Sequence, residues 1–464
     1  MKKLVSSLVS GIVAATLAAS VSLPLAMPAA AQQATGFDTG MIPAPHIFKP
    51  DGDITSSVFL VSRASGWGAA EESQAKALTD KGAIVVGIDF PSYIDSLAKD
   101  ADDCIYMISD IESLAQQVQR SIGNSSYHPP ILAGIGGGGA LVLAMIAQSP
   151  PATIDEAIAV DPTESVPLVK QLCTPAVKKP VEGGIVYALT EGALPAPVTI
   201  LLTPKATAAG KAHAQELEQY WGDIDLTDTD RTAEAALAQA LSDHIDAAAN
   251  TDQPLGLPLT ILDAKPKLDT MAIIFSGDGG WRDIDSEVGA VLQGEGIPVV
   301  GLDSLRYFWT ELKPQQVAED LDRIIKNYRR EWNVQHVVLI GYSFGADVLP
   351  ATYNLLSADQ KSRIVQMSLL ALSRQVDYEI SVSGWLGVAG DGKGGDSVED
   401  LKKISPKVVQ CIYGTDDDED PCPALAASGV QAVAIEGGHH FDEDYKALAD
   451  HIVAALKTRL QQKP

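Results

Sequence analysis

Three groups of residues in the second half of the chain have the types and the order that nucleophilic catalysis needs. Ser343 lies in the pentapeptide GYSFG, an aspartate-rich loop follows at residues 416–418, and two histidines follow at residues 439–440. A serine hydroxyl becomes a good nucleophile when an imidazole accepts its proton and a carboxylate orients that imidazole. The order Ser, Asp, His along the chain is the one expected of α/β-hydrolases. We therefore expect Ser343 to be a nucleophile.

Two histidines compete for the role of general base. His439 directly follows Gly437 and Gly438, whose small size permits a tight loop over the serine, so we expect His439 to accept the proton. His440 stays an alternative, because a sequence does not tell which of two adjacent rings points inward. A metal site on this histidine pair would need a third ligand, and none is suggested nearby. We expect neither a metal nor a cofactor.

The acid should lie in the loop that follows the run VVQCIYG. Its task is to hold the imidazole in the right tautomer and to stabilise the imidazolium. The spacing from Gly414 favours Asp417, and Asp416 and Asp418 stay alternatives. These neighbours are expected to be solvated carboxylates, since the loop lacks the D-x-D-x-D-G pattern of a calcium site.

Acyl transfer also needs two N–H donors for the oxyanion of the tetrahedral intermediate. The N–H of Phe344, directly after the nucleophile, should be the first donor. The run FSGDGGW at residues 275–281 permits close backbone approach, so we expect the second donor at Gly277 or Asp278. The other interpretation of these glycines is a tight surface turn.

A parallel sheet is needed to bring these groups to one edge. In the second half, short β-rich runs alternate with longer helix-like segments, which indicates a mostly parallel sheet covered by helices on both faces. Within residues 314–332, apolar side chains recur at helical spacing and predict a packed helix. They are Val317, Leu321, Ile324, Ile325 and Tyr328. GYSFG then lies between the run HVVLI and a helix, the context in which such a turn exposes its serine.

The first half of the chain repeats this pattern without its reactive groups. PPILAGIGGGGALVLAMIA aligns with HVVLIGYSFGADVLPATYN, KGAIVVGIDFPSY with EGIPVVGLDSLRY, and SDHIDAA with ADHIVAA. The alignment places Gly136 at the position of Ser343 and Thr232 near that of the base. We therefore predict two tandem α/β-hydrolase-like domains with mostly parallel sheets, the first degenerate and kept for packing, partner binding or substrate presentation. His213 and His244 are expected to be ordinary surface residues.

The N-terminus has the three parts of an export signal. Lys2 and Lys3 precede an apolar stretch that ends in an A-x-A pattern, which predicts cleavage after Ala31 and a periplasmic protein. An uncleaved membrane anchor is the alternative, although serines and Pro24 interrupt the stretch. We predict a signal peptide at residues 1–31, a linker at 32–50, the degenerate domain at 51–250 and the catalytic domain at 251–464.

Four cysteines suit an oxidising compartment. One disulfide in each half is the simplest pairing, Cys104 with Cys173 and Cys411 with Cys422, and the second bond would tether the acidic loop. Four free thiols are the alternative, because spacing alone does not establish the geometry of a disulfide.

The chain is strongly acidic. It carries 60 Asp and Glu against 34 Lys and Arg, a formal net charge of −26. This balance argues against nucleic acid as a partner and against loose adhesion to anionic lipid surfaces. It permits a cationic substrate or partner, although most of these carboxylates are expected to be solvated.

Several motifs together resemble the VirJ/AcvB family of bacterial virulence proteins. They are FSGDGGW, VVGLDSLRYFW, GYSFGADVLP, YGTDDDEDPCP and EGGHHFDEDY. The resemblance covers the second half densely and the first half mainly in its layout. It implies a periplasmic α/β-hydrolase that acts on aminoacyl-phosphatidylglycerol, notably lysyl-phosphatidylglycerol, at the outer face of the inner membrane. It also places the nucleophile at Ser343 and the acid and base in the two loops named above.

A lysyl ester carries two ammonium groups, so acidic residues near the serine could recognise it. We expect Asp278, Asp283 and Asp347 in this role, and Arg306 and Trp309 as contacts to lipid or phosphate, with core packing as the other interpretation of the aromatic residue. Two other functions stay open. One is a different esterase or peptidase, and the other is a non-enzymatic scaffold that binds secreted proteins or secretion machinery. The sequence leaves the oligomeric state open.

Overall fold

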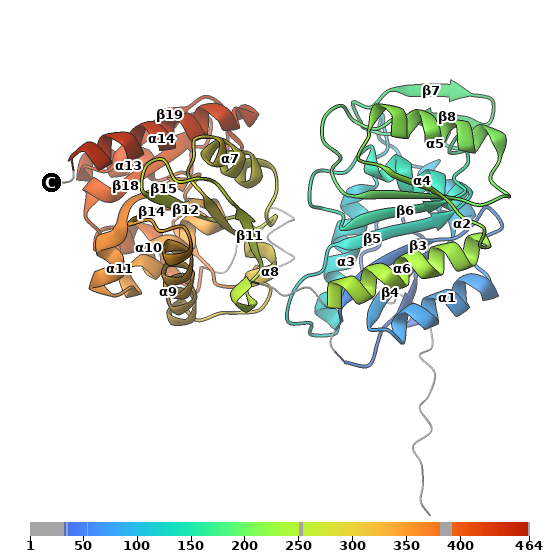
Figure 1. Ribbon diagram of the computed structural model, residues 1–464, viewed down its shortest axis with the longest axis horizontal. Coiled ribbons are helices and arrows are strands. Elements are labelled where there is room, and N and C mark those ends of the chain that lie inside the picture. Colours follow the sequence, from blue (N-terminus) through green and yellow to red (C-terminus); the bar gives the residue numbers. More distant parts are fainter. Residues whose placement is uncertain (1–31, 34–35, 53, 250–253, 381–391, 463–464) are drawn as a thin grey trace, which may run out of the picture.

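The computed structural model describes residues 32–33, 36–52, 54–249, 254–380 and 392–462. The expected signal peptide at residues 1–31 lies outside the described residues. Within the described part, no helix combines the length and the apolar character that crossing a bilayer requires. The chain forms two α/β domains that lie side by side (Figure 1).

The first domain is built on a sheet of eight strands in the order β1-β2-β4-β3-β5-β6-β9-β10. The strands are β1 (Gln32–Gln33), β2 (His46–Phe48), β3 (Ser56–Val61), β4 (Ala83–Ile88), β5 (Pro130–Ile135), β6 (Glu156–Val160), β9 (Val198–Leu202) and β10 (Asp225–Asp228). A separate hairpin is formed by β7 (Lys178–Val181) and β8 (Gly184–Tyr187).

The second domain is built on a sheet of seven strands in the order β11-β13-β12-β14-β15-β18-β19. The strands are β11 (Leu259–Leu262), β12 (Thr270–Phe275), β13 (Val299–Leu302), β14 (His336–Tyr342), β15 (Ile364–Leu370), β18 (Val409–Gly414) and β19 (Gln431–Ile435). Its separate hairpin consists of β16 (Gln375–Val376) and β17 (Gly395–Asp396).

The two sheets have the same topology. Apart from β1, each begins with one antiparallel edge strand, β2 or β11, and continues with parallel strands in the same order. This correspondence confirms the prediction of two tandem α/β-hydrolase-like domains with mostly parallel sheets.

The predicted linker at residues 32–50 is wrong for its second half. The strand β2 pairs with β4, and Ile47 and Phe48 are buried in the core. The physical reason is that β2 pairs antiparallel with β4 in the first sheet, as β11 pairs antiparallel with β13 in the second. Three residues are too few for an alternating pattern to reveal a strand in the sequence.

Helices cover both faces of each sheet (Figure 1). In the first domain, α1 (Ala69–Thr79) and α6 (Ala233–Ala249) pack on one face, and α2 (Phe90–Leu97), α3 (Ile108–Ser121), α4 (Gly137–Ile146) and α5 (Ala208–Tyr220) contribute to the core on the other. In the second domain, α7 (Asp283–Gly294) and α14 (Tyr445–Gln462) pack on one face, and α8 (Ser304–Tyr307), α9 (Pro314–Glu331), α10 (Phe344–Leu355) and α12 (Ser397–Leu401) on the other. Two short helices, α11 (Ala358–Arg363) and α13 (Cys422–Leu425), connect strands of this domain. The buried stripe of α9 is the one that the sequence predicts.

The duplication extends to single contacts. In each domain a tryptophan from the loop after the central strand packs on a glycine of the neighbouring strand. A Cβ on Gly87 would lie 2.2 Å from the Trp67 ring, and a Cβ on Gly301 would lie 2.1 Å from the Trp281 ring. No larger residue fits at either position, so the glycine and the tryptophan form one packing unit in both copies.

The domains pack against each other through buried aromatic side chains and a partly exposed ion pair. The Arg120 guanidinium, from α3, lies 3.9 Å from the centre of the Trp309 ring and donates to the Trp309 carbonyl at 2.9 Å. It also donates to the Ile380 carbonyl and pairs with Glu379 at 3.3 Å. The ring of Tyr127 packs on Trp309 at a centroid distance of 5.1 Å. Trp309 is only 1% exposed, so its expected role in lipid contact is wrong.

Candidate active site

The turn that carries Ser343 has the backbone of a nucleophile elbow. Ser343 follows β14 at φ 50° and ψ −119°, a strained conformation for a residue with a side chain. Two glycines make the turn fit. A Cβ on Gly345 would lie 2.1 Å from the Phe275 carbonyl oxygen, and one on Gly341 would lie 2.5 Å from the Gly345 carbonyl. The serine is therefore held where the strand ends and α10 begins.

The structure brings Ser343, His439 and Asp417 into one hydrogen-bonded chain. The Ser343 Oγ lies 2.9 Å from Nε2 of His439, and Nδ1 of His439 lies 3.2 Å from Oδ2 of Asp417. With its proton on Nδ1, the imidazole donates to Asp417 and accepts from Ser343. The His439 side chain is 44% exposed and that of Asp417 19% exposed, so a substrate can reach the histidine.

The other candidates for base and acid are placed differently. Nδ1 of His440 lies 3.0 Å from the hydroxyl of Tyr342 rather than beside the serine. Asp416 and Asp418 are exposed. The Asp416 N–H donates to the Gly437 carbonyl at 2.9 Å and so ties the acidic loop to the histidine loop. Of the alternatives that the sequence left open, the structure places His439 beside Ser343 and Asp417 beside His439.

Each domain contains one disulfide. Cys104 is bonded to Cys173, and Cys411 is bonded to Cys422. The second bond joins β18 to the start of α13 and therefore closes the loop that carries Asp417. A cross-link over so short a loop limits the positions that the carboxylate can take.

One of the expected oxyanion donors is used elsewhere. Gly277 lies beside the nucleophile, since a Cβ on it would be 3.8 Å from the Ser343 Cβ. Its N–H, however, donates to Oδ2 of Asp285 at 3.2 Å, so Gly277 is corrected as a donor. The N–H of Asp278 makes no hydrogen bond within the described part of the chain. Phe344 is the first residue of α10, where a helix leaves its N–H groups unpaired. Of the expected oxyanion donors, Phe344 and Asp278 therefore remain.

Asp285 is a functional candidate that sequence reasoning missed. It lies in the first turn of α7 and is buried beneath the loop of residues 275–281. Burial raises its pKa well above the usual range, and nearby Asp283 and Asp303 act in the same direction. Its Oδ1 has no hydrogen-bond partner among the described residues. The only sequence signal was its place shortly after FSGDGGW. Its hydrogen bond with Gly277 lets Asp285 hold the loop of residues 275–281 in position, which we call the oxyanion loop after its expected role.

The three carboxylates expected to meet an ammonium group differ in their exposure. Asp283 is 43% exposed at its side chain, and burial followed by the nearby Glu443 raises its pKa. Asp278 is half-buried. Asp347 is buried, and its Oδ1 accepts the Ser373 N–H at 2.7 Å. Burial, and after it the carboxyl groups of Asp420 and Asp278, raises the pKa of Asp347 well above its usual range.

Arg306 lies at the domain interface. Its carbonyl accepts the Ser126 hydroxyl at 3.5 Å, and its N–H donates to Asp303 at 3.1 Å. Its positive charge also lowers the pKa of His128, after the larger effect of burial. This position argues against the expected contact of Arg306 with a phosphate, because the sequence motif that suggested it packs between the domains.

Two histidines of the first domain are more enclosed than expected. Nε2 of His244 lies 2.8 Å from Asp155, and its Nδ1 bonds to Glu156. These two hydrogen bonds raise the pKa of His244 to about 10. His213 is half-buried on α5. Neither is the ordinary surface residue that the sequence suggested.

Asp420 gives a test by stability and pH. It is 7% exposed, and its Oδ1 accepts the Cys422 N–H at 2.7 Å. Burial, followed by the charge of Asp417, raises its pKa from 3.8 to about 7. The folded state therefore holds this proton more tightly than the unfolded state, and its stability falls as pH rises from about 4 to about 7. We expect Asp420→Asn to raise the free energy of unfolding by on the order of 2 kcal/mol at about pH 8 and to change it little at about pH 4.

Urea unfolding of both proteins at the two pH values measures this difference. The amide keeps an oxygen for the Cys422 N–H, so the loop geometry is retained. An equal effect of the substitution at both pH values would contradict the buried-carboxyl explanation.

Arg282 connects the first domain to the oxyanion loop. Its Nη1 donates to Oε1 of Glu112 at 3.2 Å and to the Thr153 hydroxyl at 2.8 Å, both in the first domain. Its guanidinium also lies against Gly279, where a Cβ would be 2.8 Å from Nε. We expect Arg282→Ala to lower kcat about tenfold with a smaller change in KM, because small displacements of a catalytic group are costly.

Kinetics on a soluble ester would measure both constants. Arg231→Ala is the matched control, since Arg231 is an exposed arginine of the first domain. A fall in the melting temperature with kcat unchanged would show that Arg282 only joins the domains.

Comparison with known proteins gives a family for the second domain. The family model described as "Bacterial virulence protein (VirJ)" matches residues 269–460. The comparison with curated proteins returned no match.

Several solved structures resemble one domain of the chain. A thermophilic esterase from Thermogutta terrifontis is 15% identical, with 43% of this chain and 93% of that chain covered and a TM-score of 0.33. A dienelactone hydrolase from Anabaena variabilis is 14% identical, with 43% and 89% covered and a TM-score of 0.30. The esterase domain of a Rhodothermus marinus protein is 17% identical, with 44% and 91% covered and a TM-score of 0.28. Residues 269–460 therefore match the VirJ family model, and the order of the strands in this domain is α/β-hydrolase-like.

Proposed function

We propose that the protein is a serine hydrolase that cleaves the aminoacyl ester of aminoacyl-phosphatidylglycerol, notably lysyl-phosphatidylglycerol. The observation that carries the proposal is the hydrogen-bonded chain from Ser343 through His439 to Asp417, with distances of 2.9 Å and 3.2 Å. A serine on an elbow, a base within reach and an acid behind that base are the parts that acyl transfer needs.

The geometry suits a two-step reaction. As the Ser343 Oγ attacks the ester carbonyl carbon, its proton passes to Nε2 of His439 and the N–H groups of Phe344 and Asp278 receive the oxyanion. When the intermediate collapses, the bond to the glycerol oxygen breaks, and His439 returns the proton to that oxygen. Phosphatidylglycerol leaves, and the aminoacyl group stays on the serine. Water then attacks the acyl-enzyme with His439 again as base, which releases the amino acid and restores the hydroxyl.

The charge of the chain supports a cationic acyl group. Asp283 and Asp278 are the accessible carboxylates near the oxyanion loop, whereas Asp347 is bonded to Ser373 and buried. The two ammonium groups of a lysyl ester outnumber the single phosphate charge of the lipid. A net charge of −26 would therefore attract this headgroup more than an unmodified anionic phospholipid.

The N-terminal sequence and the disulfides support a periplasmic location. Residues 1–31 have the parts of a cleaved signal, and both cysteine pairs are oxidised. Such an enzyme would meet its lipid at the outer face of the inner membrane.

The test is lipid chromatography after incubation with vesicles. Vesicles of lysyl-phosphatidylglycerol, alanyl-phosphatidylglycerol or unmodified phosphatidylglycerol are treated with the mature protein or its Ser343→Ala variant. Release of lysine and phosphatidylglycerol by the unchanged protein alone supports the proposal. Activity restricted to simple soluble esters would favour a different esterase. Inertness on all substrates would favour a scaffold that binds secreted proteins or secretion machinery.

A further inference from the structure

The first domain keeps the catalytic backbone without the catalytic groups. Gly136 has φ 61° and ψ −118°, close to the values of Ser343, and a Cβ on it would have no atom within 4 Å. The tight glycine packing is also retained, since a Cβ on Gly138 would lie 2.5 Å from the Ser62 carbonyl oxygen. This domain has the fold of a hydrolase without the catalytic side chains. We therefore look for its role at a surface other than the elbow.

A groove of about 1020 Å³ lies between the β7–β8 hairpin and α5 in this domain. This volume is at the upper end of the range typical of sites for small ligands, which is about 300–1,000 Å³. One face of α5 forms a wall about 16 Å long, at 1.5 Å rise per residue. Its lining residues recur at helical spacing and are Ala209, Ala212, His213, Glu216, Leu217 and Tyr220.

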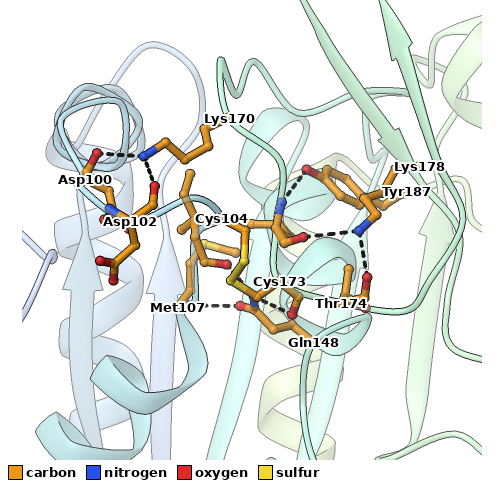
Figure 2. Close-up of a disulfide and its surroundings, with 12 residues drawn as sticks. Asp100, Asp102, Cys104, Met107, Gln148, Lys170, Cys173, Thr174, Lys178 and Tyr187 are labelled. Carbon is orange, nitrogen blue, oxygen red and sulfur yellow. Dashed lines mark hydrogen bonds between the residues drawn. A yellow bond between two sulfur atoms is a disulfide. The ribbon is translucent and has the colours of Figure 1, made fainter.

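The opposite wall is held in place by covalent and polar links. Figure 2 shows the Cys104–Cys173 disulfide in the segment that leads into the hairpin. The Leu172 N–H donates to the Tyr187 hydroxyl at 3.1 Å, and the Lys178 ammonium donates to the Thr174 carbonyl at 2.7 Å (Figure 2). A ligand entering the groove therefore meets a wall that is already ordered, which lowers the entropic cost of binding.

Part of the lining of the groove is apolar and open to solvent. Leu189 and Leu217 are buried in its floor, whereas Val177 is 72% exposed and Tyr220 is 74% exposed along it. Trp221 also lines it and is fixed by a hydrogen bond of 2.9 Å from its Nε1 to the Thr190 carbonyl. Large apolar side chains exposed together in a concave site indicate contact with another apolar group.

The charge of the groove is negative. Among the described residues, Glu164, Glu191 and Glu216 line it together with Lys179. Burial lowers the pKa of His213, so this ring is neutral at neutral pH and adds no positive charge. The charge complements a ligand with a positive group beside an apolar body.

We propose that the groove between the β7–β8 hairpin and α5 binds a cationic amphiphile, an alkyl chain with an ammonium head. The alkyl chain lies along the apolar residues of the α5 wall, and the ammonium group meets the glutamates. This site belongs to the first domain and is separate from the Ser343 centre.

The test uses the full mature chain with Ser343→Ala, so that ester cleavage plays no part. Isothermal titration compares dodecylammonium with dodecyl sulfate, which carries the same chain and the opposite charge, both below their micelle concentrations. We expect saturable binding of dodecylammonium to one site and binding of dodecyl sulfate that is at least about tenfold weaker. Equal binding of the two probes would overturn the proposal.

Two matched pairs of variants locate the site. Ala212→Trp fills the groove and should abolish binding of dodecylammonium, whereas Gln215→Trp adds the same ring outside the lining of α5 and should not. Glu216→Gln should weaken binding about threefold, and Glu218→Gln, outside the lining, should leave it unchanged. Equal affinities of Ala212→Trp and Gln215→Trp would overturn the proposal. Hydrolysis by the same variants with Ser343 intact would remain, which separates this result from a failure of the proposed function.

Discussion

Replacing Ser343 by alanine is expected to lower kcat for ester hydrolysis by about a millionfold, the effect typical of removing a triad nucleophile. The hydroxyl lies 2.9 Å from the imidazole that would take its proton, and alanine leaves no atom to form the acyl-enzyme. KM should change little, because the carboxylates and the oxyanion donors remain. Stopped-flow or steady-state kinetics on a soluble aminoacyl ester measures both constants.

The first domain supplies a matched control for this substitution. Gly136→Ser places a hydroxyl on an elbow with almost the same backbone angles, and a Cβ fits there without collision. Added to Ser343→Ala, it should restore no activity. The first domain lacks the base, because Thr232, directly before α6, lies near the position that corresponds to His439. Substantial hydrolysis by Ser343→Ala alone would mean that another residue is the nucleophile.

Replacing His439 by alanine should cost nearly as much as losing the serine, whereas His440→Ala should cost less than about tenfold. Nε2 of His439 faces the serine and its Nδ1 faces Asp417. His440 is adjacent in sequence, yet its Nδ1 lies 3.0 Å from the Tyr342 hydroxyl. The two variants remove the same group from the same loop and differ only in the partner that is lost.

The measurement is kcat on the same soluble ester, with circular dichroism to show that both variants fold. Similar losses for the two substitutions would indicate that the loop, rather than one imidazole, is what matters. A larger loss for His440→Ala would contradict the assignment of His439 as the base.

The fold was predictable because its signals are local and repeated. Alternating β-rich and helical runs predict a covered parallel sheet, and the motif GYSFG with its following acid and base has a fixed order. The Gly136 match indicates the second copy, since Gly134 and Gly138 recur at the spacing of Gly341 and Gly345. These features depend on neighbours along the chain.

Other parts of the site depend on contacts that the sequence does not encode locally. The glycine-rich run predicts Gly277 as an oxyanion donor, but its N–H is bonded to Asp285, a residue of the next helix. The sequence allows either lipid contact or core packing for Trp309, and the first domain buries it. The backbone conformation of one loop points His439 toward Ser343 and His440 toward Tyr342. Each of these outcomes was decided by tertiary packing.

The burial of Trp309 has a consequence for folding cooperativity. Its ring, Tyr127 and the aliphatic cores of both sheets form one continuous apolar cluster that crosses from domain to domain. A chain whose cores are merged in this way should melt in a single transition, because neither half can open without exposing the other's aromatic surface to water. The first domain would then permanently cover an apolar surface of the second domain. A hydrolase domain without this partner would need polar residues at that surface.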